Sequence, residues 1–353
     1  MNTTVNRTMY RFCLPTLIVL LLSCSNNDNK PNVSNITIDL SVQRFEKDFF
    51  AIDTTQMLPS LTALQKKYPS FLPIFLNNIL GIDPRQDTGF QFSEMRRFIR
   101  QNYFVYDTAM KVHPNLDEFQ SRLIKAFKYV KYYYPNYHVP KVITTVGPID
   151  ALAKMNDNYT PDFLGRDFLG VSLQFYLGRN FSVYQNNDYQ LNIVPAFRSR
   201  RFQKEYMVAD AMLIIADDIY PDTSSTKTLI EQMIEKGKQW YLVQNFIPDV
   251  PDSIITGYTQ KQLDWTRENE GNAWAYLIKN EDLYTVNPTS IQAYIGEAPF
   301  TQGMPEASPG NIGQWFGWRI IQTYVEKNPQ LSLQQVLATP ARKIFDESKY
   351  RPK

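Results

Sequence analysis

Apolar and polar residues alternate where the folded part of the chain begins. Ile36, Ile38, Leu40 and Val42 occupy every second position of "NITIDLSVQ", which is the period of a half-buried β-strand. We therefore predict a strand over residues 36–42.

A helical period replaces this alternation further along the chain. Apolar residues recur at every third or fourth position, as on one face of an amphipathic helix. The pattern predicts two helices separated by a proline-containing turn within 58–80, and further helices over 93–103 and 116–136.

The middle of the chain is rich in β-forming residues. The runs Lys141–Ile149 and Phe168–Gly178 are short and bounded by glycine, proline or asparagine, which is typical of strands. We expect the two runs to pair in one sheet.

After Phe202 the helical period returns. It predicts helices over 205–221, 225–249 and 258–280, the second of which starts with serine and threonine cap candidates. Together these elements predict an α+β fold that is mostly α-helical, with a small β-sheet and packed helices. We expect a single globular domain over 36–353.

The N-terminus has the pattern of an export signal. Arg7 and Arg11 precede an apolar run of 12 residues, Phe12–Ser23, which is shorter than the roughly 20 residues that a membrane-spanning helix needs. A basic start, a short apolar run and a small residue before the cleavage point are typical of a signal peptide. We predict a signal peptide over 1–23.

The residue after this run is a candidate lipidation site. Leu21–Cys24 looks like a bacterial lipobox, which predicts that Cys24 becomes the acylated N-terminus and anchors the chain to a membrane. More than one acyl chain is needed for stable anchoring. Residues 24–35 are polar and predict a flexible tether. The alternative is a plain secretory signal with a chance cysteine.

Cysteine and charge exclude several classes of function. The only two cysteines are Cys13, inside the predicted signal, and Cys24, so we expect no disulfide, no CxxC zinc site and no cysteine nucleophile in the globular part. The chain has 37 lysines and arginines against 35 acids, and 35 of each remain without Arg7 and Arg11. A neutral chain lacks the basic excess typical of nucleic-acid binding.

The two histidines do not form a recognisable site. His113 and His138 stand beside prolines in predicted loops, and no HExxH or Cys/His cluster is present. We expect no histidine-ligated metal, although a calcium site built from carboxylates and carbonyls stays open. A Ser-His-acid triad is disfavoured because no G-x-S-x-G surrounds a serine. We predict no cofactor.

Carboxylates are the remaining candidates for catalysis. Glu231 and Glu235 are four residues apart and share a helix face, and paired acids are the residues that glycosidases use. Acids at this spacing more often form a solvated helix face. Glu268 with Glu270, and Asp217 with Asp218, are further acidic pairs.

The glycines in "SPGNIGQWFGWRII" raise a choice between phosphate binding and packing. Gly310, Gly313 and Gly317 match neither GxxxxGK[ST] nor GxGxxG, and no strand leads into them. Gly313 and Gly317 are four apart on one helical face, where another backbone can approach closely. We favour packing, and we predict that Ser308 and Pro309 start this helix.

Several long segments resemble the GldB family of gliding motility lipoproteins of the Bacteroidetes, over nearly the whole chain after Cys24. Gly313, Trp315, Gly317 and Trp318 form its most recognisable block. The segments, besides the lipobox, are "SLQFYLGRNFSVYQ", "IEKGKQWYLVQNFIPDVPDSIITGYTQKQLDW", "ENEGNAWAYL", "EAPF", "SPGNIGQWFGWRIIQTYVEKNP" and "SKYRPK".

That family is in turn similar in outline to HExxH-type metallopeptidases. The resemblance implies a zincin-like or gluzincin-like scaffold with the metal site lost, because the helix "EYMVADAMLIIADD" lacks the two histidines and the glutamate that zinc chemistry needs. Glu235 would fall near the place of the third ligand, and we expect it to make a structural hydrogen bond. Gly237 and Glu270 are the other candidate degenerate-site or structural residues.

For function, the resemblance implies a non-catalytic, lipid-anchored envelope component of the gliding machinery, linked to type IX secretion. We expect it to face the periplasm and to bind extended peptide or protein partners by strand addition. The first alternative is a residual hydrolase that uses Glu231, Glu235, Glu268 or Glu270 on peptide or glycan. The second is a purely structural lipoprotein on which motility depends indirectly.

Overall fold

A computed structural model describes residues 1, 30–155 and 158–353. Apart from Met1, the predicted signal peptide 1–23, Cys24 and the tether up to residue 29 lie outside the described residues. The contacts divide the chain into two units, Met1–Pro31 and Asn32–Lys353. Every helix and strand below belongs to the second unit.

A four-stranded mixed sheet carries the order β1-β2-β6-β5. β1 (Val42–Arg44), β2 (Lys141–Thr145) and β6 (Phe168–Ser172) run parallel, and β5 (Phe163–Leu164) pairs antiparallel with β6 at the edge. The pairing of β2 with β6 confirms the prediction for these two runs. A separate hairpin is formed by β3 (Ala153–Met155) and β4 (Asn158–Thr160).

The predicted strand over 36–42 is wrong for most of its length. Only Val42 belongs to a strand, because β1 pairs with β2 from Val42 opposite Val142 onward. The N–H of Val42 donates to Oε1 of Gln120 at 3.0 Å, and the residues before Val42 pair with no strand in the described part of the chain. The apolar alternation there marks a half-buried extended segment, in which Leu40 is buried.

Helices form most of the remaining chain, which confirms the mostly helical α+β prediction. Before β2 and through the middle of the chain they are α1 (Phe45–Phe50), α2 (Met57–Lys67), α3 (Phe71–Ile74), π-helix η1 (Phe75–Ile79), α4 (Thr88–Val112), α5 (Asp117–Tyr133), 3-10 helix η2 (Leu173–Phe175), α6 (Asn187–Asn192), α7 (Ala196–Ser199) and 3-10 helix η3 (Lys204–Tyr206). After them come α8 (Met207–Ile219), α9 (Leu229–Phe246), α10 (Asp252–Thr256), α11 (Gln260–Glu268), α12 (Glu270–Asn280), α13 (Pro288–Ile295), α14 (Ile312–Lys327), α15 (Leu333–Ala338) and α16 (Ala341–Ser348).

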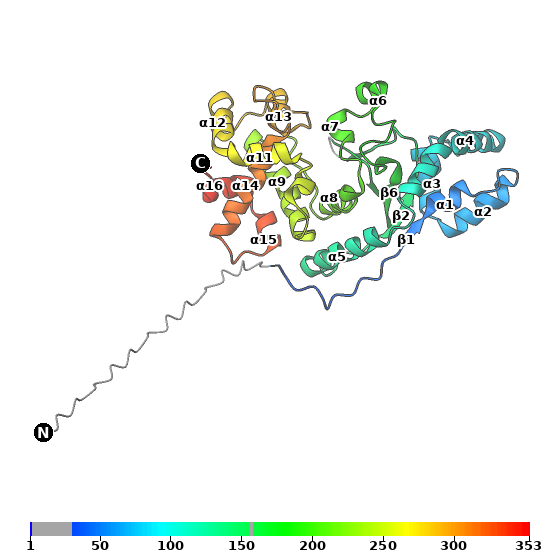
Figure 1. Ribbon diagram of the computed structural model, residues 1–353, viewed down its shortest axis with the longest axis horizontal. Coiled ribbons are helices and arrows are strands. Elements are labelled where there is room, and N and C mark those ends of the chain that lie inside the picture. The colour runs from blue at the N-terminus through cyan, green and yellow to red at the C-terminus, as the bar shows by residue number, and fades with distance from the viewer. Residues whose placement is uncertain (2–29, 156–157) are drawn as a thin grey trace. The chain divides into compact units, whose positions relative to one another are not determined.

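Helix α8 joins two parts of the unit. In Figure 1 the sheet and α1–α4 lie on one side of α8, and α9–α16 lie on the other. α8 contacts β5 and β6 as well as α9, and its buried apolar residues face both. Helix α8 therefore connects the edge of the sheet to α9, and α5, which contacts both α8 and α9, adds a second connection.

Phenylalanines fill the space between the sheet and the first helices. Phe45 lies 4.8 Å from Phe71 and 4.8 Å from Phe75, measured between ring centroids, and Phe71 lies 5.1 Å from Phe168 of β6. These side chains are fully buried, and aromatic pairs at such separations stabilise beyond the area that they bury.

Glycines bring α9 and α14 into backbone contact. A Cβ atom built on Gly317 would lie 1.8 Å from the carbonyl oxygen of Met233, and one built on Gly237 would lie 2.4 Å from the carbonyl carbon of Gly317. Only glycine lets two helices approach this closely. The structure thus places Gly237 and Gly317 at the same helix crossing, with Gly313 one turn earlier beside Tyr294.

Helix α14 does not start where we predicted. Its first residue is Ile312 and its N-cap is Asn311, not Ser308 with Pro309. Ser308 is buried and its hydroxyl accepts a hydrogen bond from the N–H of Thr301. The serine therefore fixes the loop before the helix.

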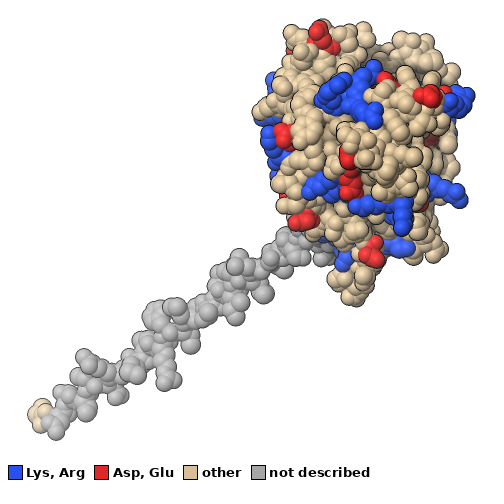
Figure 2. Space-filling model, turned by 90° about the vertical axis from the view of Figure 1, so that its right-hand side faces the viewer, with Lys and Arg blue, Asp and Glu red and all other residues tan. Residues whose placement is uncertain are grey.

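Charged side chains are dispersed over the surface that Figure 2 shows, where lysine and arginine lie among aspartate and glutamate on a mostly uncharged background.

Within residues 30–155 and 158–353, no helix combines the length and the hydropathy of a bilayer-spanning segment.

Candidate functional site

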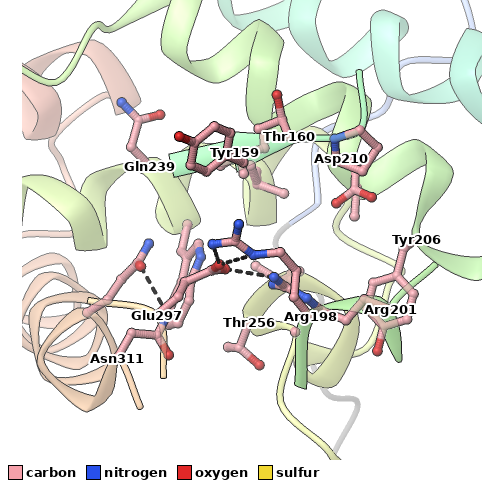
Figure 3. A pocket seen from close by; sticks show the side chains of 18 of the residues that line it. Tyr159, Thr160, Arg198, Arg201, Tyr206, Asp210, Gln239, Thr256, Glu297 and Asn311 are labelled. Carbon is pink, nitrogen blue, oxygen red and sulfur yellow. Dashed lines mark hydrogen bonds and ion pairs between the residues drawn. The ribbon is translucent and has the colours of Figure 1, made fainter. Parts of the chain in front are cut away.

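A cavity of about 120 Å³ lies between α8 and α9. We call it the interhelical cavity. Strand β4, the segment around α7, the end of α10 and the loop before α14 complete its walls (Figure 3). Its polar lining residues are Tyr159, Thr160, Arg198, Arg201, Tyr206, Asp210, Asp217, Asp222, Lys236, Gln239, Thr256, Glu297, Asn311 and Gln314.

Two arginines share one carboxylate at one end of this cavity. Arg198 donates from Nε to Oε2 of Glu297 at 2.8 Å, with a second bond from its Nη2, and Arg201 donates from Nη2 to Oε1 at 2.7 Å. The Arg198 guanidinium also lies over the Tyr159 ring, 5.8 Å from its centroid. Charge-assisted bonds of this kind fix the planes of the guanidinium groups.

The arginines determine the protonation of Glu297. Burial alone would raise the pKa of its carboxyl, but Arg201 and Arg198 outweigh that effect and lower the pKa to about 2. Glu297 is therefore ionised at any physiological pH, and it compensates one of the two positive charges.

A pair of carboxyl groups, Asp162 and Asp210, lies near the sheet. The hydroxyl of Tyr176 lies 2.8 Å from Oδ2 of Asp162 and 3.1 Å from Oδ2 of Asp210. Asp162 is fully buried, and its Oδ1 accepts from the N–H of Ser172 at 3.0 Å. Asp210 comes from α8, and Figure 3 shows its carboxylate directed into the cavity.

The hydroxyl of Tyr176 lies within hydrogen-bond distance of both acids. A tyrosine hydroxyl carries one proton, so it can donate to only one carboxylate. Burial and the neighbouring Asp210 raise the pKa of Asp162 well above its ordinary value. The environment therefore favours the neutral form of Asp162, next to a hydroxyl that also reaches Asp210.

Asp210 itself is destabilised as an anion. Burial raises its pKa to about 6, while Arg201 and the Tyr176 hydrogen bond act in the opposite direction. Since the unfolded aspartate ionises near 3.8, the folded state binds the extra proton between pH 3.8 and pH 6. This group therefore lowers stability as pH rises through that window, and its cost is full above it.

We expect Asp210→Asn to stabilise the fold by about 1–2 kcal/mol at pH 7.5, and to bring almost no gain at about pH 3, where the carboxyl is largely protonated in the folded and in the unfolded state. The asparagine oxygen can still accept from Tyr176. Urea unfolding at the two pH values measures the difference. An equal effect at both pH values would mean that the ionised carboxyl is not the destabilising group.

The opposite end of the cavity is rich in acceptors. Gln239 of α9 is 7% exposed, and its Nε2 donates to the carbonyl oxygen of Tyr220 at 2.5 Å. Its Oε1 is buried, and no described residue donates to it. Nearby, Lys236 of α9 pairs with Asp222, in the loop after α8, at 3.3 Å.

A second, more open recess lies beside strand β5 at the edge of the sheet. Its volume is about 230 Å³, and we call it the edge recess. It shares Thr160 and Asp217 with the interhelical cavity. Its lining residues are Ala153, Lys154, Thr160, Asp162, Phe163, Leu164, Ile214, Asp217 and Asp218.

Comparison with known proteins identifies the family. The model of the family "Gliding motility protein GldB" matches residues 26–352. The chain belongs to the GldB family. This finding confirms the resemblance, and membership supports a role as a component of gliding motility. A search of curated proteins and a search of solved structures found no match.

For this GldB family member, the structure places Glu235 outside the interhelical cavity. Its Oε2 accepts from the Tyr220 hydroxyl at 2.9 Å, and its Oε1 lies 3.3 Å from Nζ of Lys238. Lys238 is buried and also donates to the carbonyl oxygens of Leu337 and Thr339, at 2.9 Å each. Glu235 thus belongs to a network that ties α9 to α15.

Glu270 also makes structural contacts. It accepts from Nε of Arg319 at 3.1 Å and from the Tyr350 hydroxyl, which joins the start of α12 to α14 and to the end of the chain. Glu231 forms the capping box of α9 with Thr228. In the described part of the chain, the four glutamates of the hydrolase alternative do not line the interhelical cavity.

The two tryptophans of the family block belong to an aromatic cluster beside the helix crossing. Trp315 and Trp318 lie 5.6 Å apart, and Trp318 lies 6.0 Å from Trp240, between ring centroids. Nε1 of Trp318 donates to Gln244 at 3.1 Å. Trp240 lines the cavity, so this cluster supports one of its walls.

The described residues contain no group of three or more histidine, cysteine, aspartate or glutamate side chains placed to hold a metal ion. His113 and His138 both lie outside helices and strands, as predicted. Nε2 of His113 contacts the carbonyl oxygen of Tyr176 at 2.9 Å, so its ring supports the segment that carries the tyrosine.

The sequence analysis missed Arg198, Arg201, Asp210 and Glu297. One signal was available, since Glu297 begins "EAPF", a segment that already carried the family resemblance. Asp210 lies in the helix "EYMVADAMLIIADD", whose pattern was informative only about the missing zinc ligands. The arginines gave no signal, because their partner Glu297 is about a hundred positions away along the chain.

Proposed function

We propose that this protein is a non-catalytic envelope component of the gliding machinery, linked to type IX secretion, which binds an extended polypeptide segment of a partner in the edge recess and the interhelical cavity. We propose further that Cys24 carries the lipid anchor and that the folded part faces the periplasm. Family membership supports the gliding role, and the lipobox sequence supports the anchor.

The observation that carries this proposal is the position of the edge recess. It is lined by both residues of β5, the last strand of the sheet, and it shares the lining residues Thr160 and Asp217 with the interhelical cavity. An exposed sheet edge next to side-chain pockets is the arrangement by which proteins bind an extended peptide as an added strand. Main-chain bonds provide affinity, and the pockets provide specificity.

The backbone of Leu164 offers the bonds for such a strand. Gly165 donates to the carbonyl oxygen of Phe168, and Phe163 lies opposite Gly170. Alternate residues of an antiparallel pair bond to the partner strand, so the N–H and C=O of Leu164, between these positions, point away from β6.

The absence of catalysis is part of the proposal. On α8 the cavity face presents Ala209, Asp210, Leu213 and Asp217 and no histidine, where a metallopeptidase of the HExxH type would need two histidine ligands and a glutamate as general base. One zinc ion per chain in the purified protein at neutral pH, or cleavage of a peptide bound in the recess, would overturn this part.

A proline at position 164 tests the proposal. Leu164→Pro removes the outward N–H and leaves the β6 pairing of Phe163 and Gly165 in place, whereas Leu164→Ala keeps the N–H and serves as the matched control. In a gliding strain whose own family member is deleted, we expect the alanine variant to restore colony spreading and the proline variant to fail. Both variants should show the same thermal unfolding midpoint. Normal spreading with the proline variant would contradict strand addition at β5.

A further inference from the structure

The outward side of α4 carries three arginines and two aromatic residues within nine positions of the sequence. Arg97, Arg100 and Phe104 are three and four positions apart, so they form one stripe along the helix. Arg96 and Tyr103 flank this stripe. All five side chains are exposed, while the buried residues of α4 lie on the opposite side of the helix. We call these five residues the α4 face.

The positive charge of the α4 face is only partly compensated within the protein. Arg97 pairs with Glu94, whereas Nε of Arg96 donates to the uncharged carbonyl oxygen of Thr54 at 2.9 Å. Arg100 forms no ion pair with another described residue. Like charges one helical turn apart repel each other. With three arginines against one glutamate, this part of the helix keeps two uncompensated positive charges.

The aromatic side chains of the α4 face are more exposed than packing requires. Tyr103 and Phe104 are each 54% exposed, although the Phe104 ring stacks on Phe181 with its centroid 6.5 Å away. Arginine, tyrosine and phenylalanine are enriched in protein–protein interfaces. Figure 2 looks onto the side of the unit where Figure 1 shows α4, and a group of blue side chains lies in its upper part.

A partner has to supply negative charge and apolar surface in a fixed order along α4. Carboxylates form paired, planar hydrogen bonds with guanidinium groups, and apolar side chains pack against exposed rings. The arginines come first along the helix and the two rings follow them one turn later. An amphipathic helix with carboxylates and then apolar residues on one face has the same spacing.

An anionic membrane surface also carries negative charge, but the tether places it elsewhere. The described chain enters the unit beside α5, where Nζ of Lys128 lies 3.5 Å from the Ser34 carbonyl oxygen. In Figure 1 this part of α5 lies toward α15, and α4 lies at the other end of the unit. Cys24 is eight positions before Asn32, which reaches at most about 28 Å. A lipid anchor on Cys24 therefore holds the end opposite to α4 near the membrane.

We infer that the α4 face binds an acidic amphipathic helix of a partner protein. This surface is separate from β5 and from the interhelical cavity, because no residue of α4 lines that cavity or the edge recess. The inference goes beyond the proposed function, and it takes from it only the anchor at Cys24.

The test uses an acetylated and amidated helical peptide of glutamate, leucine and alanine, in which glutamates and then leucines follow one face. In two further peptides glutamine or lysine replaces every glutamate. Fluorescence anisotropy with the purified acylated chain in detergent measures binding. We expect the glutamate peptide to bind at least about tenfold more tightly than the glutamine peptide, and this preference to shrink at high salt.

Variants of the protein localise the effect. Arg100→Glu should reverse the preference, so that the lysine peptide binds more tightly than the glutamate peptide. Arg85→Glu should leave the preference unchanged, because Arg85 is 89% exposed, precedes α4 and pairs with Asp83. Tyr103→Ala should weaken the glutamate and glutamine peptides alike, since it removes apolar contact and no charge.

A lipid probe separates a protein partner from a membrane. An environment-sensitive dye on Gln101→Cys, an exposed position between the arginines and the rings, should fluoresce equally when the chain is in phosphatidylglycerol or in phosphatidylcholine vesicles. Brighter fluorescence in phosphatidylglycerol would show that the α4 face lies on lipid, and the inference would be wrong.

The inference also fails if the glutamate and glutamine peptides bind equally well, or if Arg100→Glu does not reverse the preference. None of these results bears on β5, so the proposed strand addition would stand. Conversely, normal spreading with Leu164→Pro, or a mass spectrum without acyl chains on Cys24, would count against the proposed function and leave the peptide preference of the α4 face as measured.

Discussion

Gly317→Ala is expected to lose at least about 3 kcal/mol of folding free energy, or to prevent folding altogether. The new Cβ would lie 1.8 Å from the Met233 carbonyl oxygen and 2.4 Å from its carbonyl carbon. Both atoms belong to the backbone of α9, so no flexible side chain can move aside. The alanine gains at most about 1 kcal/mol of helix propensity, which is less than the cost of separating the two helices.

Urea unfolding followed by circular dichroism measures this loss. Glu326→Ala is the matched control, because Glu326 is an exposed residue of the same helix, and its unfolding free energy should change by no more than about 0.5 kcal/mol. If the Gly317→Ala variant has the same urea midpoint of unfolding as the wild type, α9 and α14 do not cross in backbone contact.

The second large effect is expected at the arginine end of the cavity. Glu297→Gln should cost about 3 kcal/mol at pH 7, because the glutamine leaves two largely buried guanidinium groups without their counter-charge. The side chains of Arg198 and Arg201 are only 15% and 27% exposed, so solvent screens them weakly. The same magnitude follows from a carboxyl whose pKa falls from 4.5 to about 2, at about 1.4 kcal/mol per pKa unit.

The pH dependence of this loss has a defined sign. In the folded protein Glu297 stays ionised down to about pH 2, while the unfolded glutamate takes up its proton near 4.5. The stabilisation is therefore full above pH 4.5 and is lost as pH falls toward 2. The difference between wild type and Glu297→Gln should shrink when unfolding is measured at pH 3.5 instead of pH 7.

Glu347→Gln is the control for this series, since Glu347 pairs with Lys343 on the exposed face of α16 and such pairs contribute little. An equal loss for Glu297→Gln at both pH values would show that shape, and not charge, explains the effect. If the Glu297→Gln variant were as stable as the wild type at pH 7, Glu297 would not be paired with two buried arginines.

Local patterns predicted the longer helices and the positions of β2 and β6, because each is determined by residues close in the chain, but the one helix expected over 258–280 is two, α11 and α12. The cap of α9 at Thr228 is an example. The prediction of a strand over 36–42 was wrong because alternating apolar and polar residues indicate an extended, half-buried segment. They do not show that a partner strand is present. Ser308 failed as a cap because its hydroxyl bonds back to Thr301 in the preceding loop.

The candidate site was harder to predict, for a different physical reason. Its charged groups come from α8, the segment around α7 and the loop after α13, and only the tertiary fold brings them together. Glu235 was a reasonable candidate from its helix alone, but α9 is buried on nearly every side. Helical spacing could therefore not show which of its faces lines the cavity.

The central claim, that an extended partner segment binds along β5, is tested most directly by photo-crosslinking in gliding cells. Tyr159 lines the cavity and is 51% exposed, so a photoreactive residue at position 159 reports on the occupant, and one at position 326 is the control. We predict adducts with an envelope protein from position 159 that persist in the Leu164→Ala background and disappear in the Leu164→Pro background. Adducts that are unchanged by Leu164→Pro, or no adduct from position 159 in cells that spread normally, would contradict the account.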